Sequence, residues 1–209
     1  MFHQKNNNMK RISLAIMLVL CTLSLAAQDV IRVDYKGAKP TIIDFAWAFL
    51  FSEEEDEDEC DQEATAGQKL ALDNYRKGLP QEEGVTFTVD VRNGYILYEW
   101  KDNESDRSSK TEMCYWNEAD GKHKLFAYNS WYYENGVPAG GQYDGLIFYR
   151  YTNATKKMVM CDDPGFETEY FNTSYDLPRN GKDIIVNKWD DNGKKTQKTL
   201  KWNGRRFNK

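Results

Sequence analysis

Four carboxylates lie in or beside strand-like runs and could take part in acid-base chemistry: Glu99, Glu112, Glu134 and Asp144. Glycoside hydrolysis uses one carboxyl group as the general acid and a second as nucleophile or base, about 5 to 9.5 Å apart. Spacing along the chain does not fix that separation in space. A carboxylate-dependent glycan hydrolase is therefore one hypothesis for the function, and the sequence assigns no individual catalytic residue.

Histidine is scarce, which excludes several kinds of catalytic and metal site. Apart from His3, His123 is the only histidine of the chain. A His-rich zinc site or an H-E-x-x-H protease is therefore excluded. A Ser-His-Asp triad would have to include His123, whose place between two lysines after Asp120-Gly121 predicts an exposed imidazole. The sequence has no glycine-rich phosphate loop, and we expect neither a cofactor nor a metal.

A run of aromatic residues, Trp131-Tyr132-Tyr133, precedes a loop over residues 135–142 that contains glycine and proline. Flat aromatic side chains beside a flexible loop are typical of surfaces that bind sugars or proteins. We therefore predict that Trp131, Tyr132 and Tyr133 contact a ligand. The alternative is that they belong to the core, because aromatic residues alternate through every strand-like segment of this chain.

The chain begins with a leader. Lys10 and Arg11 precede an apolar run that ends on small residues at Ala27, which is the pattern of a secretory signal peptide. We predict a signal peptide over residues 1–27 and a protein exported to the periplasm or the extracellular space, with no transmembrane segment in the mature chain. Lipid anchoring at Cys21 is less favoured, because the bulky Leu20 precedes it and the apolar run continues beyond it.

The charge and the cysteine content of the chain limit which partners it could bind and which redox chemistry it could perform. The net charge is −5, and removing the leader takes away three basic residues, so the mature chain is more acidic. Nucleic acid is therefore not an expected partner. The run over residues 53–63 holds nine carboxylates and predicts a solvated acidic loop. Three cysteines follow the leader, Cys60, Cys114 and Cys161; they allow at most one internal disulfide.

The elements that position these residues are helical first and then β. Thr41 and Asp44 predict the start of a helix that ends near Ser52, and a second helix is expected over about 64–77, with Leu70 and Tyr75 on its inner side. Four hairpins follow, with turns at Asn93-Gly94, at Asp120-Gly121, over 153–155 and at Asn192-Gly193.

We predict an α+β fold that is mainly antiparallel β, with an N-terminal helical segment before a meander of about four hairpins. Residues 28–209 should form a single globular domain, either a two-layer sandwich or a barrel. A two-residue turn at Asn93-Gly94 would place Val91 opposite Ile96, Val89 opposite Tyr98 and Phe87 opposite Trp100. Tyr98 and Trp100 should then be buried.

Several hairpin and turn segments resemble those of small exported proteins of unknown function from Bacteroidota. These segments are Glu112-Met113-Cys114-Tyr115-Trp116-Asn117, Gly141-Gln142-Tyr143-Asp144-Gly145-Leu146, Leu177-Pro178-Arg179-Asn180-Gly181-Lys182-Asp183-Ile184 and Leu200-Lys201-Trp202-Asn203-Gly204. The resemblance implies a bacterial periplasmic or surface setting and no particular activity. Together with the leader it favours a binding or interaction module of the cell envelope, with a glycan or a protein as partner. The alternatives are the hydrolase above and an inhibitor of an extracellular enzyme.

Overall fold

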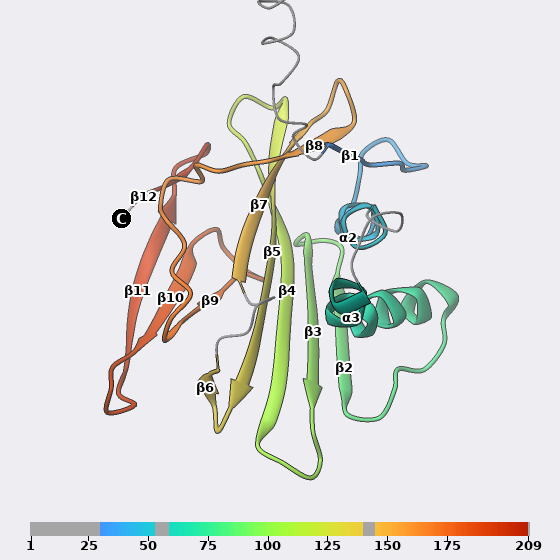
Figure 1. Ribbon diagram of the computed structural model, residues 1–209. Helices are drawn as coiled ribbons and strands as arrows, with labels where there is room; N and C mark the ends of the chain where they lie inside the picture. Colours follow the sequence, from blue (N-terminus) through green and yellow to red (C-terminus); the bar gives the residue numbers. More distant parts are fainter. Residues whose placement is uncertain (1–29, 53–58, 140–144, 209) are drawn as a thin grey trace, which may run out of the picture. The chain divides into compact units, whose positions relative to one another are not determined.

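Two β-sheets, antiparallel in every pairing described below, contain most of the regular secondary structure in a computed structural model that describes residues 30–52, 59–139 and 145–208 (Figure 1). The predicted leader, Cys21 and Asp144 lie outside these residues. The first sheet has the strand order β1-β8-β7-β5-β4-β3-β2, and β6 pairs with β5. Its strands are β1 (Val30–Arg32), β2 (Val85–Asp90), β3 (Tyr95–Lys101), β4 (Arg107–Asn117), β5 (His123–Glu134), β6 (Val137–Pro138), β7 (Gly145–Thr152) and β8 (Lys157–Met160).

The second sheet is formed by the C-terminal part of the chain. Its order is β12-β11-β10-β9, with β9 (Thr173–Asp176), β10 (Ile184–Trp189), β11 (Lys195–Trp202) and β12 (Phe207–Asn208). The expected α+β class is confirmed, since a short helical segment precedes a chain that is mainly antiparallel β. Neither sheet closes into a barrel, and the hairpins β4–β5, β7–β8 and β10–β11 form where they were predicted.

The first helix begins and ends close to the predicted residues. Helix α2 spans Ile42–Leu50, and the carboxylate of Asp44 accepts hydrogen bonds of 2.7 Å from both the backbone N–H and the hydroxyl of Thr41. These bonds satisfy a donor that the helix itself leaves free. Phe45 and Leu50 are buried against the first sheet.

The second helix differs from the prediction at its start and in its inner face. Helix α3 spans Glu59–Lys77, so the helix already includes residues 59–63 of the predicted acidic loop, while residues 53–58 lie outside the described part of the chain. Leu70 and Tyr75, expected on the inner side, are each 41% exposed. The inner side instead contains Gly67, where an added Cβ would lie 2.4 Å from the hydroxyl oxygen of Tyr98. This close approach of helix and strand sets the rotation of α3.

The register of the β2–β3 hairpin differs from the prediction by two residues. Val89 pairs with Ile96, Phe87 with Tyr98 and Val85 with Trp100. Because the shift is an even number, each side chain stays on its predicted face, but Trp100 is only partly buried. The turn is longer than expected because Asp90 accepts hydrogen bonds from the backbone N–H and the side-chain amide of Asn93, at 3.1 and 2.9 Å.

The first sheet separates two hydrophobic cores. Along β5, Phe126 and Tyr128 pack with α2, whereas Leu125 and Ala127 belong to the core shared with the second sheet. Figure 1 shows the helices on one side of the first sheet and β9–β12 on the other. The middle strands are therefore buried on both faces, which explains why their sequences are apolar throughout rather than alternating with polar residues.

Candidate functional site

The three aromatic residues predicted to contact a ligand do not form one surface. Trp131 is 1% exposed, packs near Tyr175 and donates a hydrogen bond of 2.6 Å from Nε1 to the Asn129 side chain. Its expected place on a binding surface is therefore wrong, because strand alternation turns it into the core between the sheets. Tyr132 points to the opposite face of β5, and Tyr133 is partly buried beside that core. Ligand binding by these two tyrosines stays a prediction.

Among the candidate carboxylates that the structure describes, Glu112 is the one that is buried. One of its oxygens accepts from the Tyr95 hydroxyl at 2.6 Å and lies 3.2 Å from Nζ of Lys110. The other accepts from the Asn129 amide at 3.1 Å and from the backbone N–H of Leu177 at 3.0 Å. Burial raises the pKa of Glu112 above its usual value, and this outweighs the opposing effect of Lys110. Both oxygens are occupied by donors of the protein itself.

A second carboxylate converges on the same lysine. Asp176 lies 2.8 Å from Nζ of Lys110 and also accepts from the Asn187 amide. Burial acts to raise the pKa of Asp176, but the hydrogen bonds from Asn187 and Lys110 lower it overall. This pair was not foreseen from the sequence, because Asp176 reaches β4 only through the packing of the two sheets. The cluster connects β4 and β5 to β9. Because its polar groups bond to one another, the cluster acts as a joint that holds the two sheets together.

The other described candidates, Glu99 and Glu134, pair with basic residues or lie opposite them. Glu99 lies opposite Lys110 in the β3–β4 register. Glu134 is at the far end of β5, where its carboxylate is 3.4 Å from the Arg107 guanidinium. Asp144 is outside the described residues.

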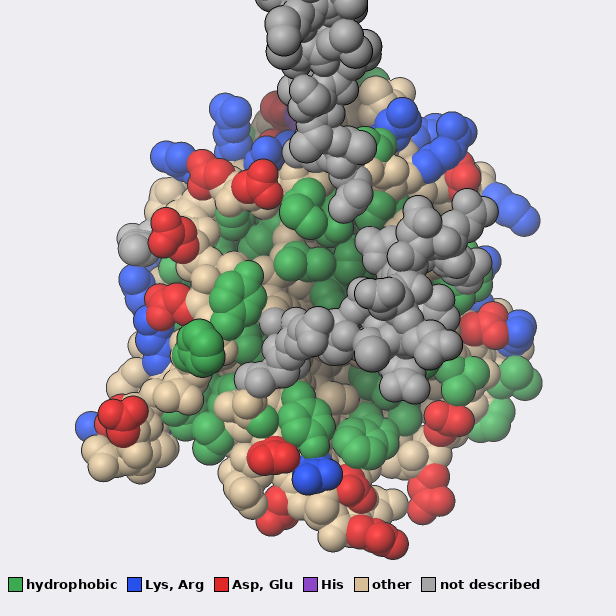
Figure 2. Space-filling view, viewed as in Figure 1, with side chains coloured by type: hydrophobic (Ala, Val, Ile, Leu, Met, Phe, Trp, Pro, Cys, Tyr) green, Lys and Arg blue, Asp and Glu red, His purple; other side chains and the backbone are tan. Residues whose placement is uncertain are grey.

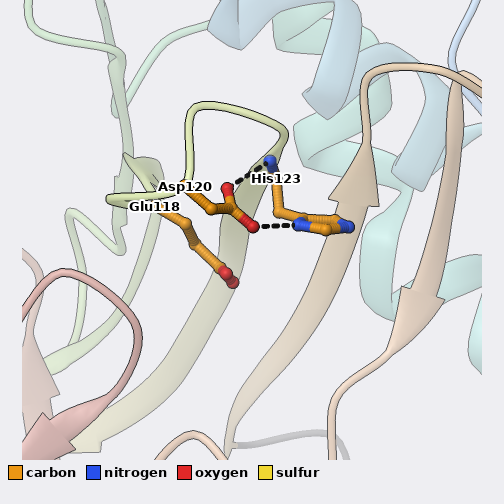
Figure 3. A group of neighbouring side chains, drawn as sticks. All are labelled: Glu118, Asp120 and His123. Carbon is orange, nitrogen blue, oxygen red and sulfur yellow. Dashed lines mark hydrogen bonds and ion pairs between the residues drawn. The ribbon is translucent and has the colours of Figure 1, made fainter.

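His123 is held by a carboxylate rather than simply solvated. Figure 3 shows Glu118, Asp120 and His123 around the β4–β5 turn, with the His123 ring pointing at Asp120. Nδ1 of His123 lies 2.5 Å from Oδ2 of Asp120, and Oδ1 accepts from the backbone N–H groups of Lys122 and His123. The first of these contacts is the main reason that the pKa of Asp120 falls to about 2.

This group has the ligand types of a metal site. One donor atom from each of the three side chains lies within 4.8 Å of the others. However, the Glu118 carboxylate is buried and accepts a hydrogen bond of 2.7 Å from Nε of Arg150. A cation bound here would meet the guanidinium charge and compete with the bonds that hold the turn. These contacts explain the three side chains as a group that stabilises the β4–β5 turn.

A groove lies at the edge of β7. Strand β8 pairs with β7 only from Tyr149 to Thr152, and the chain then leaves the sheet as a segment of residues 161–172, which we call the strap. The first half of β7 thus borders a cavity of about 450 Å³ between the sheet and the strap. We call this cavity the edge groove; its lining includes Leu146, Phe148, Met160, Asp162, Phe166 and Tyr170.

Large hydrophobic side chains are exposed on the strap. Phe171 is 91% exposed and Tyr170 49%, and Met160 at the end of β8 is also exposed. Figure 2 shows hydrophobic side chains gathered on this face of the molecule. Exposed aromatic residues beside a hollow are a common feature of binding surfaces. The feature of the sequence that could have indicated this surface is the long connection after β8, which contains Pro164-Gly165 and the pair Tyr170-Phe171.

Several contacts fix the strap. The carbonyl of Pro164 accepts a 2.8 Å hydrogen bond from the backbone N–H of Phe207, and the Tyr175 hydroxyl accepts one of the same length from the N–H of Glu169. Gly165 has a φ of 105°, and an added Cβ would lie 2.1 Å from the Phe207 carbonyl oxygen. On its far side the strap borders a second hollow of about 700 Å³ against β9–β11. The wall of the edge groove is therefore anchored at several points.

Two of the three cysteines that follow the leader have side chains that the structure describes. Cys114 and Cys161 are free and buried, and burial raises the pKa of both thiols; the side chain of Cys60 lies outside the described residues. Within the described residues, no helix is both long and apolar enough to cross a membrane. Comparison with family models, curated proteins and solved structures gives no match to this chain.

Proposed function

We propose that the protein is an exported binding module of the cell envelope and that the edge groove is its binding site. The export part of the proposal rests on the leader pattern. The observation that supports the site is the combination of a cavity at the sheet edge with exposed Tyr170 and Phe171 on a well-anchored strap. Exposed aromatic side chains that lie together beside a hollow are typical of surfaces that a partner covers.

The hydrolase alternative has less support in the structure. Glu112 is the buried one among the described carboxylate candidates, but four donors of the protein occupy its two oxygens. A general acid has to bring its proton to the substrate. Glu112 would have to give up bonds that connect the two sheets before it could do so.

A binding screen with a chemical readout tests the proposal. The purified protein is incubated with envelope glycans and with envelope proteins, and both retention and product release are measured. We expect retention without product, and we expect Tyr170→Ser with Phe171→Ser to weaken it at least tenfold. The matched control is Leu79→Ser, which removes a similarly exposed apolar side chain elsewhere. Product release that is lost in Glu112→Gln would overturn the proposal.

A further inference from the structure

We infer that the outer edge of β11 is a second binding surface, which takes up an extended, acidic segment of a partner protein as an added strand. This surface belongs to the second sheet and shares no residue with the edge groove, so the inference goes beyond the proposed function. It is carried by three features of β11: its unpaired edge, the direction of its backbone groups and its unpaired lysines.

The edge of β11 that faces away from β10 is uncovered over most of its length. Strand β12 pairs with β11 only at Lys201 and Trp202, and among the described residues no strand pairs with the rest of this edge. Figure 1 shows β11 as the outermost long strand of the second sheet. Every residue from Lys195 to Thr199 is exposed. This open stretch measures about 17 Å at roughly 3.4 Å per residue, which is the length of a short strand.

The backbone of this stretch directs hydrogen-bonding groups outward. The carbonyl of Lys194 accepts a 3.1 Å hydrogen bond from the N–H of Asp190, so it points toward the β10 side. Because backbone groups alternate in direction along an antiparallel strand, those of every second residue point away from β10, namely Lys195, Gln197 and Thr199. The N–H of Asn203 belongs to the same series and bonds to the Arg206 carbonyl on the β12 side, at 3.1 Å. An extended chain could pair with the outward groups.

The charge of the edge predicts the charge of the bound segment. Residues 194–202 contain no carboxylate and four exposed lysines: Lys194, Lys195, Lys198 and Lys201. Within the described part of the chain, none of these lysines forms an ion pair. Since side chains alternate across a strand, Lys195 and Lys198 project to opposite faces. Carboxylates on either face of an added strand would therefore meet a lysine.

The same lysines disfavour other occupants. Two copies of β11 paired edge to edge would bring their lysines together, and like charges on facing strands are destabilising. A polyanion without a peptide backbone would contact the lysines but would leave the outward backbone groups unpaired. An acidic polypeptide strand satisfies both the charges and the backbone groups.

The test uses short capped peptides in which pairs of glutamates alternate with threonine-valine pairs, so that both faces carry carboxylates, and measures their affinity for the purified protein by calorimetry. We expect binding that weakens as salt rises, because exposed ion pairs are screened. Peptides with lysine in place of glutamate should not bind. Lys195→Gln with Lys198→Gln should lower the affinity by roughly two- to fivefold per charge. Lys36→Gln with Lys157→Gln, which removes two exposed lysines outside β11, is the matched control and should leave the affinity unchanged.

A second arm tests the backbone bonds. Thr199→Pro removes one outward N–H and keeps every lysine, and proline is tolerated where the N–H of an edge strand faces solvent. We expect it to lower the affinity about tenfold or more, whereas Thr199→Ala, which keeps the N–H, should leave the affinity unchanged. N-methylation at alternate residues of the peptide removes the same kind of bond without altering the protein, and it should weaken binding to a similar extent.

The outcomes separate this inference from the proposed function. Equal binding of the methylated and unmethylated peptides would overturn strand addition, because charge alone would then account for the affinity. If no acidic peptide binds, the whole inference is wrong, and the edge groove stays a separate proposal with its own screen. Tyr170→Ser with Phe171→Ser should bind the acidic peptides as the parent protein does; a loss of binding in that variant would place the peptide in the edge groove and overturn the assignment to β11.

Discussion

Glu112 shows at the scale of one residue how a feature that suggests catalysis can serve the fold. A carboxylate buried on the inner face of β4 is costly unless it is fully hydrogen-bonded. Its partners come from β3, β4, β5 and the residue after β9. The same carboxylate thus ties three strands of the first sheet to the second sheet.

Replacing Glu112 with Gln should destabilise the protein strongly. The new amide would place an NH₂ group against donors, and Lys110 would lose one of its two carboxylate partners. We expect the free energy of unfolding to fall by about 3 kcal/mol, as measured by urea denaturation. Glu134→Gln, at an exposed ion pair with Arg107, should change it by less than about 1 kcal/mol. Equal urea midpoints for the two variants would show that the Glu112 cluster does not hold the sheets together.

At the scale of elements, the hydrophobic pattern was sufficient to predict most strands and their faces. The alternation of Phe87 and Val89 with threonines identified β2, and an Asp-Gly turn located the β4–β5 hairpin. The pattern could not give the exact register, because the hydrogen bonds that Asn93 donates to Asp90 lengthen the turn. It also could not give the rotation of α3, which depends on the contact of Gly67 with Tyr98, a residue distant in sequence.

The binding residues were the least predictable. Trp131 is an aromatic residue of the kind that often contacts ligands, but its exposure depends on whether a second sheet covers that face of β5. Phe171, which is far more exposed, lies in a segment without a periodic pattern, so no pattern predicts its exposure. Sequence patterns report local geometry, whereas exposure is decided by packing between elements.

The β2–β3 turn offers a test of the observed register. Gly94 has a φ of 66°, and an added Cβ would lie 2.8 Å from the Tyr115 ring. Gly94→Ala should therefore destabilise the protein by about 1 to 3 kcal/mol more than Gly78→Ala, since Gly78 has a similar φ of 69° and nothing within 4 Å. Thermal unfolding of the two variants measures the difference. Equal melting temperatures would argue against this turn.

At the scale of the whole molecule, one sheet separates two hydrophobic cores. Phe126 and Trp131 lie on opposite faces of β5, and both are almost completely buried. Since their side chains share one strand, we expect the two cores to unfold as a single cooperative unit.

Truncating either aromatic residue should shift the same unfolding transition to lower denaturant concentration. Phe126→Ala and Trp131→Ala are each expected to cost about 3 to 5 kcal/mol, with near- and far-ultraviolet circular dichroism changing at the same denaturant concentration. Phe171→Ala, on the exposed strap, should change stability by no more than about 0.5 kcal/mol. Two separate transitions, each affected by only one of the core variants, would show that the cores fold independently.

The joint at Glu112 also affects how the chain folds as it is synthesised. Its bond to Leu177 connects residues 65 positions apart, and the Lys110–Asp176 pair spans 66. When β4 and β5 emerge from the ribosome, the strands that cover Trp131 and complete the hydrogen bonds of Glu112 have not been made. Contacts between distant residues form slowly, and uncovered apolar strands aggregate. A chain that stops before β9 would therefore be an aggregation hazard rather than a smaller functional domain.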